Sequence, residues 1–152
     1  MTSPARIRTF LWFQAGQLDE VLAFYEATFG AGLVVSETNR MEPDGPLFTA
    51  DFSLFGHEFI GMSVEGGPSF NDSVSISIEC DGQAETDRLW AALTAEGSPG
   101  RCGWCTDKWG LSWQVSPKQM RDWLGHSDPA VSAYAWEALR GMGKIVIDEL
   151  HH

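Results

Sequence analysis

The chain has 152 residues, of which 10 are basic and 21 acidic, giving a formal net charge of −11. This charge argues against nucleic acid and anionic membranes as partners, and no apolar run approaches the roughly 20 residues that a membrane span needs. The length fits a single domain, residues 1–152, built as one unit or as two small modules sharing a core.

The numbers of tryptophans and cysteines indicate whether the protein has a binding surface and in which cellular compartment it lies. Seven tryptophans are many for this length, so we expect some of them to line a cavity or an interface. The N-terminal sequence MTSPARIRTF lacks the apolar segment of a secretion signal, and the cysteines number three, which is odd. We therefore expect a cytoplasmic protein whose thiols are free.

The first half of the chain predicts a strand, a helix and three more strands. Residues 7–13 alternate, with Ile7, Thr9, Leu11 and Phe13 on one face and Arg8, Phe10 and Trp12 on the other. A helix over 17–29 has an apolar stripe of Leu18, Val21, Leu22, Tyr25 and Phe29. Strands are predicted at 33–37, 47–55 and 58–64, the last two joined by a hairpin at Gly56-His57.

The second half repeats this order after a linker at 65–72. Residues 73–80 alternate, with Val74, Ile76, Ile78 and Cys80 on one face and Ser73, Ser75, Ser77 and Glu79 on the other. Asp81 is a candidate N-cap for a helix over 82–96, whose inward residues are Thr86, Leu89, Trp90 and Leu93. A hairpin of 101–107 and 111–116 follows, then helices at 118–124 and 129–140 and a strand at 144–148.

The two halves have the same order of elements. Gly16-Gln17 and Gly82-Gln83, which open the two helices, lie 66 residues apart, so the pattern is an internal repeat. If the aliphatic row of each first strand faces a helix, the opposite row is free to line a cavity with apolar walls and a few polar groups. Phe10, Trp12 and the serines belong to that opposite row.

Several motifs resemble one known family. These are FLWFQAGQLDEVLAFYEATFG, ECDGQAETDRLWAAL and CGWCTDKWGLSWQV, with Phe24-Tyr25 and the run D-x-x-G-x-x-W-Q at 107–114. Together they resemble the PhnB-like branch of the vicinal oxygen chelate superfamily, which includes glyoxalases and bleomycin-resistance proteins and often carries the label 3-demethylubiquinone-9 3-methyltransferase-like. The resemblance covers roughly residues 6–148.

The resemblance implies an α+β fold of two βαβββ modules, usually assembled as a homodimer. The modules are 6–65 and 72–116, followed by C-terminal helices and a last strand at 117–150. Their mixed, curved sheets would carry the helices on the outer face and a cavity on the inner face. Enzymes of the superfamily hold a divalent metal in that cavity, and the matching positions here are Phe10, Gly61 or Met62, Ser75 and Gln114.

These side chains are poor metal ligands, because phenylalanine, glycine and methionine offer a hard ion no oxygen and serine offers little. We therefore expect no metal. The methyltransferase label also lacks a sequence basis, since QAGQ after the first strand is no glycine-rich nucleotide turn, and we expect no cofactor. The ligand-binding residues we predict are Phe10, Trp12, Met62, Ser75, Glu79 and Gln114.

Cys102 and Cys105 form a C-x-x-C motif with two readings. A redox pair sits at a helix N-terminus, whereas here the motif precedes a turn and a strand, so two reduced thiols are the favoured interpretation. A zinc site is disfavoured because Cys80 is the only other thiol. Glu79 is either a buried base or cation ligand, or a solvated carboxylate at the cavity rim.

Three functions stay open. The favoured hypothesis is a metal-free, dimeric protein that binds a cationic or aromatic small molecule, as bleomycin-resistance members of the superfamily do. The second is a metal-independent enzyme, whether a lyase, an isomerase or the transferase of the family label. The third is a dimer in which the pocket is vestigial.

Overall fold

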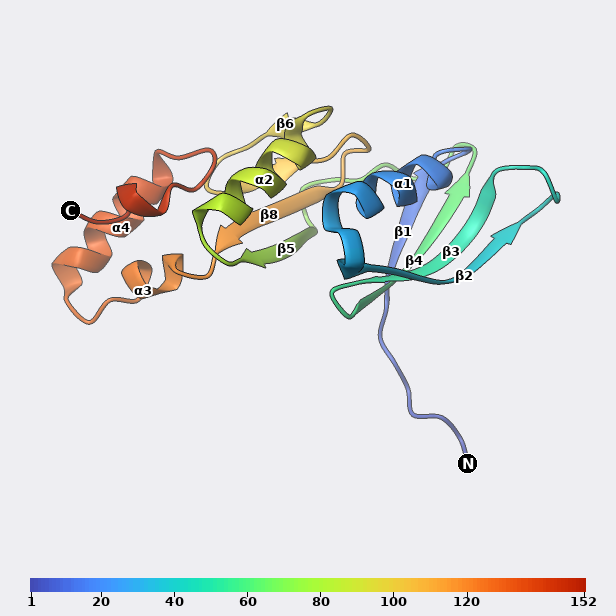
Figure 1. Cartoon of the computed structure of the whole chain (residues 1–152), viewed down its shortest axis with the longest axis horizontal. Coiled ribbons are helices and arrows are strands. Elements are labelled where there is room, and N and C mark those ends of the chain that lie inside the picture. Colours follow the sequence, from blue (N-terminus) through green and yellow to red (C-terminus); the bar gives the residue numbers. More distant parts are fainter. The chain divides into compact units, whose positions relative to one another are not determined.

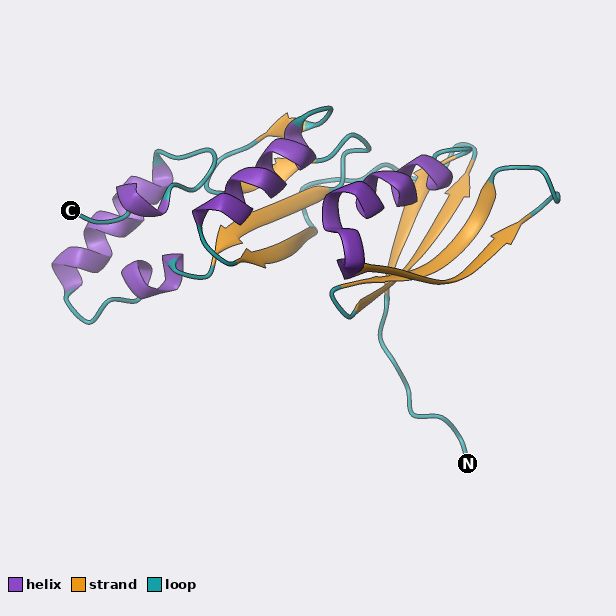
Figure 2. Ribbon diagram, in the orientation of Figure 1, coloured by secondary structure: helices purple, strands orange, loops and turns teal.

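Each half of the chain builds a four-stranded mixed sheet with a helix against one face, as Figures 1 and 2 show. The computed structural model describes all 152 residues and divides into two units, Met1–Ser69 and Phe70–His152. No helix is long and apolar enough to cross a membrane.

The first unit has the sheet order β1-β4-β3-β2, with β1 parallel to β4 and the other pairs antiparallel. Its elements are β1 (Thr9–Gln14), α1 (Leu18–Phe29), the short 3-10 helix η1 (Gly30–Gly32), β2 (Leu33–Arg40), β3 (Leu47–Leu54) and β4 (His57–Val64). The hairpin between β3 and β4 turns at Phe55-Gly56, one residue earlier than predicted, and both residues have positive φ. Such a turn matches the twist of the strands it joins.

Helix α1 covers one face of this sheet, and its predicted apolar stripe is fully confirmed. All five stripe residues are buried, as are Leu11 and Phe13 on β1 beneath them. The helix lies very close to β4, because a Cβ on Gly61 would come within 2.8 Å of Leu18 Cδ1. Buried and exposed side chains therefore alternate along β1 because α1 covers only the face that carries Leu11 and Phe13.

The second unit repeats the topology, with the order β5-β8-β7-β6 and β5 parallel to β8. Its elements are β5 (Ser75–Cys80), α2 (Gln83–Thr94), β6 (Ser98–Pro99), β7 (Trp104–Thr106) and β8 (Ser112–Pro117). The repeat and the α+β fold predicted from the sequence are thus confirmed. Thr86, Leu89 and Leu93 of α2 are buried as predicted, whereas Trp90 is only half-buried.

The second sheet is smaller than the predicted strands. β5 starts at Ser75, which leaves Val74 exposed outside the strand. The predicted strand 101–107 is reduced to Trp104–Thr106, because Cys102 and Gly103 have φ of 56° and 85° and bend the chain out of extended geometry. β6, the edge strand, has only two residues.

The Asp81 cap is a wrong prediction. The residue before α2 in the cap position is Gly82, and no side chain caps that end. Asp81 instead forms an ion pair with Lys118 at 2.8 Å, and its backbone N–H donates to the Glu85 side chain. The ion pair and a hydrogen bond from Gln119 lower the pKa of Asp81.

The last part of the chain is helical. It contains α3 (Met120–Leu124), α4 (Pro129–Arg140), which Asp128 caps through Ala130 N, and the 3-10 helix η2 (Ile147–Glu149). The strand predicted at 144–148 is wrong, because Ile145 and Leu150 turn into a buried cluster with residues of α4. Its members are Ala135, Leu139, Met142, Ile145 and Leu150.

Candidate functional site

An exposed aromatic pair lies on the open face of the first sheet, the face that α1 does not cover. Phe10 and Trp12 of β1 keep 44% and 38% of their surface accessible, whereas Leu11 and Phe13 between and beside them keep 4% and 2%. The two exposed rings are 5.4 Å apart between centroids and tilted by 48°. A flat apolar group could pack against both rings.

The neighbouring strand extends this apolar surface. Ile60 and Met62 of β4 are the register partners of Phe10 and Trp12, and both are partly buried. Met62, a predicted ligand residue, therefore lies beside Trp12 on the same face. A flexible thioether next to an aromatic ring is suited to adaptable apolar contact.

An ion pair borders the aromatic pair on this face. Arg8 Nη1 lies 2.8 Å from Asp51 Oδ2, and both side chains are about a quarter exposed. They line a cavity of about 320 Å³ together with Arg6, Glu58 and other residues of β2 to β4. Because Arg6 also lies 3.9 Å from Glu58, the charges of this cavity neutralise one another.

The open face of the second sheet is polar. Gln114 of β8 donates from Nε2 to Ser75 Oγ of β5 at 2.7 Å, which brings two predicted ligand residues into contact. Trp104 of β7 is the register partner of Gln114 on its other side and is 44% exposed. The Oε1 atom of Gln114 accepts no hydrogen bond within the protein, so this face offers an acceptor beside an indole.

Glu79 lies at the end of the same strand face. It is exposed, and its Oε2 atom is 2.7 Å from Arg121 Nη2 of α3. A solvated, ion-paired carboxylate has neither the burial nor the free position that a general base needs. Of the two readings of Glu79, the geometry supports the solvated carboxylate.

Asp107 fixes which way β8 faces, and sequence reasoning did not single out its role. It is buried, its Oδ1 accepts from the backbone N–H of Trp109 and Leu111, and its Oδ2 accepts from Trp113 Nε1 at 2.9 Å. This holds Trp113 on the helix side of β8. Its neighbour Gln114 then necessarily points to the open face.

The side chains at the positions that the family resemblance implies for a metal are poor ligands. Phe10 and Met62 supply no oxygen, and Ser75 and Gln114 bond each other. No group of three or more histidine, cysteine, aspartate or glutamate side chains is placed so that it could hold a metal ion. Asp51, on the open face of the first sheet, and Glu79, on that of the second, are each held by an arginine.

The C-x-x-C cysteines are free thiols in two different environments. Cys105 is buried in β7, and burial raises the pKa of its thiol to about 12. Cys102 lies in the turn before β7 and its Sγ donates to Leu139 O at 3.4 Å. A thiol with so high a pKa is a poor nucleophile at neutral pH, which argues against a redox role.

Two charged residues that sequence reasoning missed share a cavity of about 450 Å³ with Trp104. They are Asp72, just before β5, and Arg101, in the turn before β7. Nothing in the sequence distinguishes either residue, because a single charged residue in a predicted linker or turn looks the same as any other charged residue exposed to solvent. Only the fold brings residues 72 and 101 to one hollow.

The sequence matches the family model described as 3-demethylubiquinone-9 3-methyltransferase over residues 5–116. Among solved structures it is similar to a PhnB protein from Bacillus cereus described by the same activity, with 25% identity, coverage of 74% of this chain and 99% of that chain, and a TM-score of 0.66. No curated protein matches the sequence.

Two more distant solved structures share the fold. A protein from Pseudomonas aeruginosa is 21% identical, with coverage of 74% of this chain and 98% of that chain and a TM-score of 0.58. The fosfomycin resistance protein FosX from Listeria monocytogenes, solved with Mn(II) and 1S,2S-dihydroxypropylphosphonic acid, is 14% identical, with coverage of 79% and 98% and a TM-score of 0.54.

Proposed function

Because the chain belongs to the 3-demethylubiquinone-9 3-methyltransferase family, in the PhnB-like branch of the glyoxalase and bleomycin-resistance superfamily, we propose that it binds a small molecule without a metal. The observation that carries this proposal is the exposed pair Phe10 and Trp12, whose rings lie 5.4 Å apart on an uncovered sheet face. Large exposed aromatic groups on one strand face are unusual in soluble proteins unless a ligand or partner covers them.

The chemistry of the two open faces suggests the ligand. Phe10, Trp12 and Met62 suit a flat, partly apolar molecule, and aromatic faces also attract cations. The net charge of −11 favours a cationic guest over an anionic one. On the second sheet, we assign ligand contact to the polar groups of Ser75 and Gln114 and to the exposed carboxylate of Glu79.

The family description names a methyltransferase, but methyl transfer from a nucleotide-type donor such as S-adenosylmethionine does not fit these residues. A nucleotide cradle needs a glycine-rich turn between a parallel strand and a helix. Here β1 leads to α1 through Gln14 to Gln17 with a single glycine, and Gln17 N donates to Ser63 Oγ, which closes the turn on the protein itself. We therefore derive no transfer step.

The aromatic pair is tested with a flat aromatic cation, 9-aminoacridine, in isothermal titration calorimetry. Trp12→Ala removes one of the two rings, so we expect at least a tenfold loss of affinity, about 1.4 kcal/mol, in keeping with stacking and cation–π energies. Trp136→Ala is the matched control, since Trp136 is also exposed, at 48% against 38% for Trp12, but lies on α4. Equal affinity of the Trp12→Ala variant and the wild type would overturn the proposal.

Elemental analysis of the purified protein checks the metal-free part of the proposal. We expect no stoichiometric divalent metal and no thermal stabilisation by S-adenosylmethionine. A metal bound at one equivalent per chain, lost on Ser75→Ala or Gln114→Ala, would contradict it.

We also propose a cytoplasmic homodimer. Three free thiols, two of them buried, suit a reducing compartment. The first unit exposes Val34 and Val35 in addition to Phe10 and Trp12, and a second copy of the chain would cover such exposed apolar side chains.

A further inference from the structure

The cavity beside Trp104 contains two opposite charges, and neither forms an ion pair with the other or with any other side chain. Asp72 accepts a hydrogen bond from Ser112 Oγ at 3.3 Å and forms no ion pair. Arg101 donates from Nη2 to the backbone oxygen of Arg140 at 3.4 Å and likewise forms no ion pair. This differs from the cavity of the first unit, where Arg8 and Asp51 are in contact.

Trp104 forms an apolar wall of the same cavity and is held firmly. Its backbone N–H donates to Arg101 O at 3.0 Å, and its backbone oxygen accepts from Gly100 N at 2.9 Å. The intervening turn uses positive φ at Cys102 and Gly103. A Cβ on Gly103 would meet Val115 O and Ile145 at 2.8 Å, so this turn is packed as well as hydrogen-bonded.

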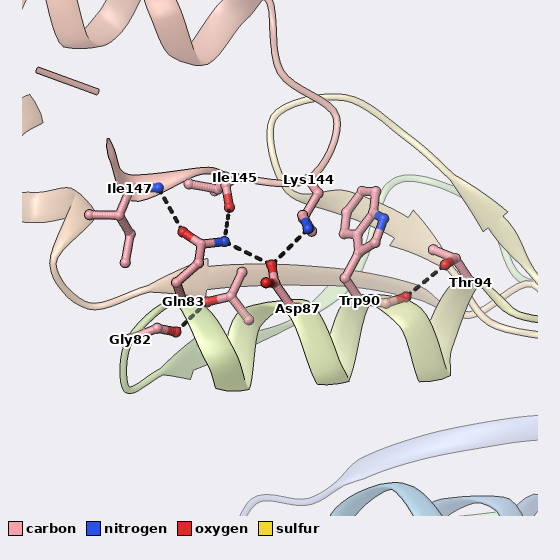
Figure 3. Close-up of polar contacts among 9 residues, drawn as sticks. Gly82, Gln83, Asp87, Trp90, Thr94, Lys144, Ile145 and Ile147 are labelled. Carbon is pink, nitrogen blue, oxygen red and sulfur yellow. Dashed lines mark hydrogen bonds and ion pairs between the residues drawn. The ribbon is translucent and has the colours of Figure 1, made fainter. Parts of the chain in front are cut away.

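The C-terminal segment supports this turn from outside the family match, which ends at residue 116. Cys102 N and Gly103 N donate to Met142 O and Gly143 O, each at 2.8 Å. The segment is itself tied to α2, because Gln83 bonds Ile145 O and Ile147 N, as Figure 3 shows. Residues 117–152 thus fix the turn that carries Arg101 and Trp104.

We propose that this cavity binds a zwitterionic small molecule of amino-acid type, with an ammonium group, a carboxylate and a flat apolar side group. The guanidinium of Arg101 binds the carboxylate, for which its planar fork is suited. The carboxylate of Asp72 binds the ammonium group, and the indole of Trp104 packs against the apolar group. A volume of about 450 Å³ lies within the range of small-molecule sites.

The zwitterion fits better than an ion of either sign. A cation alone would leave Arg101 without a partner, and an anion alone would leave Asp72 without one while approaching a chain of net charge −11. This site lies within the second unit and needs no contribution from Phe10 or Trp12. It therefore does not depend on the aromatic pair that carries the function proposed above.

Three probes of matched size test the proposal by NMR titration: L-phenylalanine, 3-phenylpropionate, which lacks the ammonium group, and 2-phenylethylamine, which lacks the carboxylate. The signal followed is the indole N–H of Trp104, assigned by its loss in Trp104→Phe. We expect L-phenylalanine to bind about tenfold more tightly than either analogue, since each removes one charge-assisted contact.

Two substitutions test which residue binds each charged group of the ligand. We expect Arg101→Gln to reduce the affinity for L-phenylalanine to that of 2-phenylethylamine, and Asp72→Asn to reduce it to that of 3-phenylpropionate. Arg140→Gln is the matched control, since it removes an exposed arginine but keeps the backbone oxygen that holds Arg101. We expect Arg140→Gln to leave the binding of L-phenylalanine unchanged.

Three results would overturn the proposal: no saturable binding of any probe, equal affinity for all three, or no effect of Arg101→Gln. None of them bears on the Trp12 experiment, so the two proposals fail separately. Arg101, Asp72 and Trp104 are all exposed, so their substitution leaves the core intact, which an unchanged spectrum of the buried amides confirms.

Discussion

Asp107 shows how one buried side chain orients a strand. Its carboxylate accepts hydrogen bonds from the backbone N–H of Trp109 and Leu111 and from the indole of Trp113. The first two bonds close the turn before β8, and the third keeps Trp113, which is 1% exposed, under α2. The D-x-x-G-x-x-W-Q motif thus orients β8 so that the side chain of Gln114 points to the open face.

The substitution Asp107→Asn tests this role. An amide retains one acceptor oxygen but turns an N–H₂ group toward either the indole or the two backbone amides, which leaves buried donors facing each other. We expect the protein to lose about 2 kcal/mol of stability, the cost of such unsatisfied groups, seen as a lower melting temperature in calorimetry. Asp44→Asn, in an exposed loop, is the control; an equal effect of both variants would contradict the role.

The cysteines make a similar point about single residues. Cys105 and Cys102 are spaced as in a redox motif, but burial raises the pKa of Cys105 to about 12. Cys102 lies in a left-handed turn rather than on a strand. Spacing alone says nothing of burial, and burial decides whether a thiolate forms.

At the scale of elements, the second unit differs from the first mainly at its edge. β2 has eight residues, whereas its counterpart β6 has two. The chain that would continue this edge turns away at Gly100, and the backbone N–H groups of Cys102 and Gly103 bond the segment after α4. The C-terminal segment therefore satisfies backbone groups that a full edge strand would otherwise pair.

Gln83 is the principal link between this segment and α2. Its Oε1 accepts from Ile147 N at 2.8 Å, and its Nε2 donates to Ile145 O at 2.9 Å and to Asp87 Oδ1 at 2.8 Å. We expect Gln83→Ala to speed hydrogen exchange of the Ile147 amide at least tenfold, since part-buried backbone groups lose their partners.

The ion pair of Lys144 and Asp87 serves as the comparison for Gln83. Both side chains are more than a third exposed, so Asp87→Ala should change exchange far less. The hydrogen bond from Lys144 lowers the pKa of Asp87 below 3.8. The stabilisation that this ion pair gives the folded protein is therefore present at neutral pH, and it is lost only as the pH falls through the lowered pKa of Asp87. A larger effect of Asp87→Ala than of Gln83→Ala at neutral pH would contradict this ranking.

At the scale of the whole molecule, the proposed dimer is the property most open to direct measurement. Apolar side chains that one copy leaves exposed, among them Phe10 and Trp12, are a reason for a second copy to bind. We expect light scattering after size-exclusion chromatography to give twice the chain mass of 16.8 kDa. A mass of one chain over a dilution series starting at high concentration would contradict the proposal.

The sequence by itself determined the repeat, the α+β fold and the helix-facing rows of β1 and α1. These follow from periodicity, because apolar residues at strand or helix spacing must be buried on one side wherever the element lies. The same argument placed Phe10 and Trp12 on the open face. The failures, the Asp81 cap and the strand at 144–148, occurred where a distant partner such as Lys118 or Gln83 decided the outcome.

Only the tertiary structure decided which polar groups meet. The contacts of Ser75 with Gln114, Glu79 with Arg121 and Arg8 with Asp51 join residues far apart in the chain. So does the cavity shared by Asp72, Arg101 and Trp104. A single charged or hydrogen-bonding residue has no periodicity in the sequence. Its partner is determined by strand register and by the direction that each turn gives the backbone, and neither of these can be predicted from the sequence pattern alone.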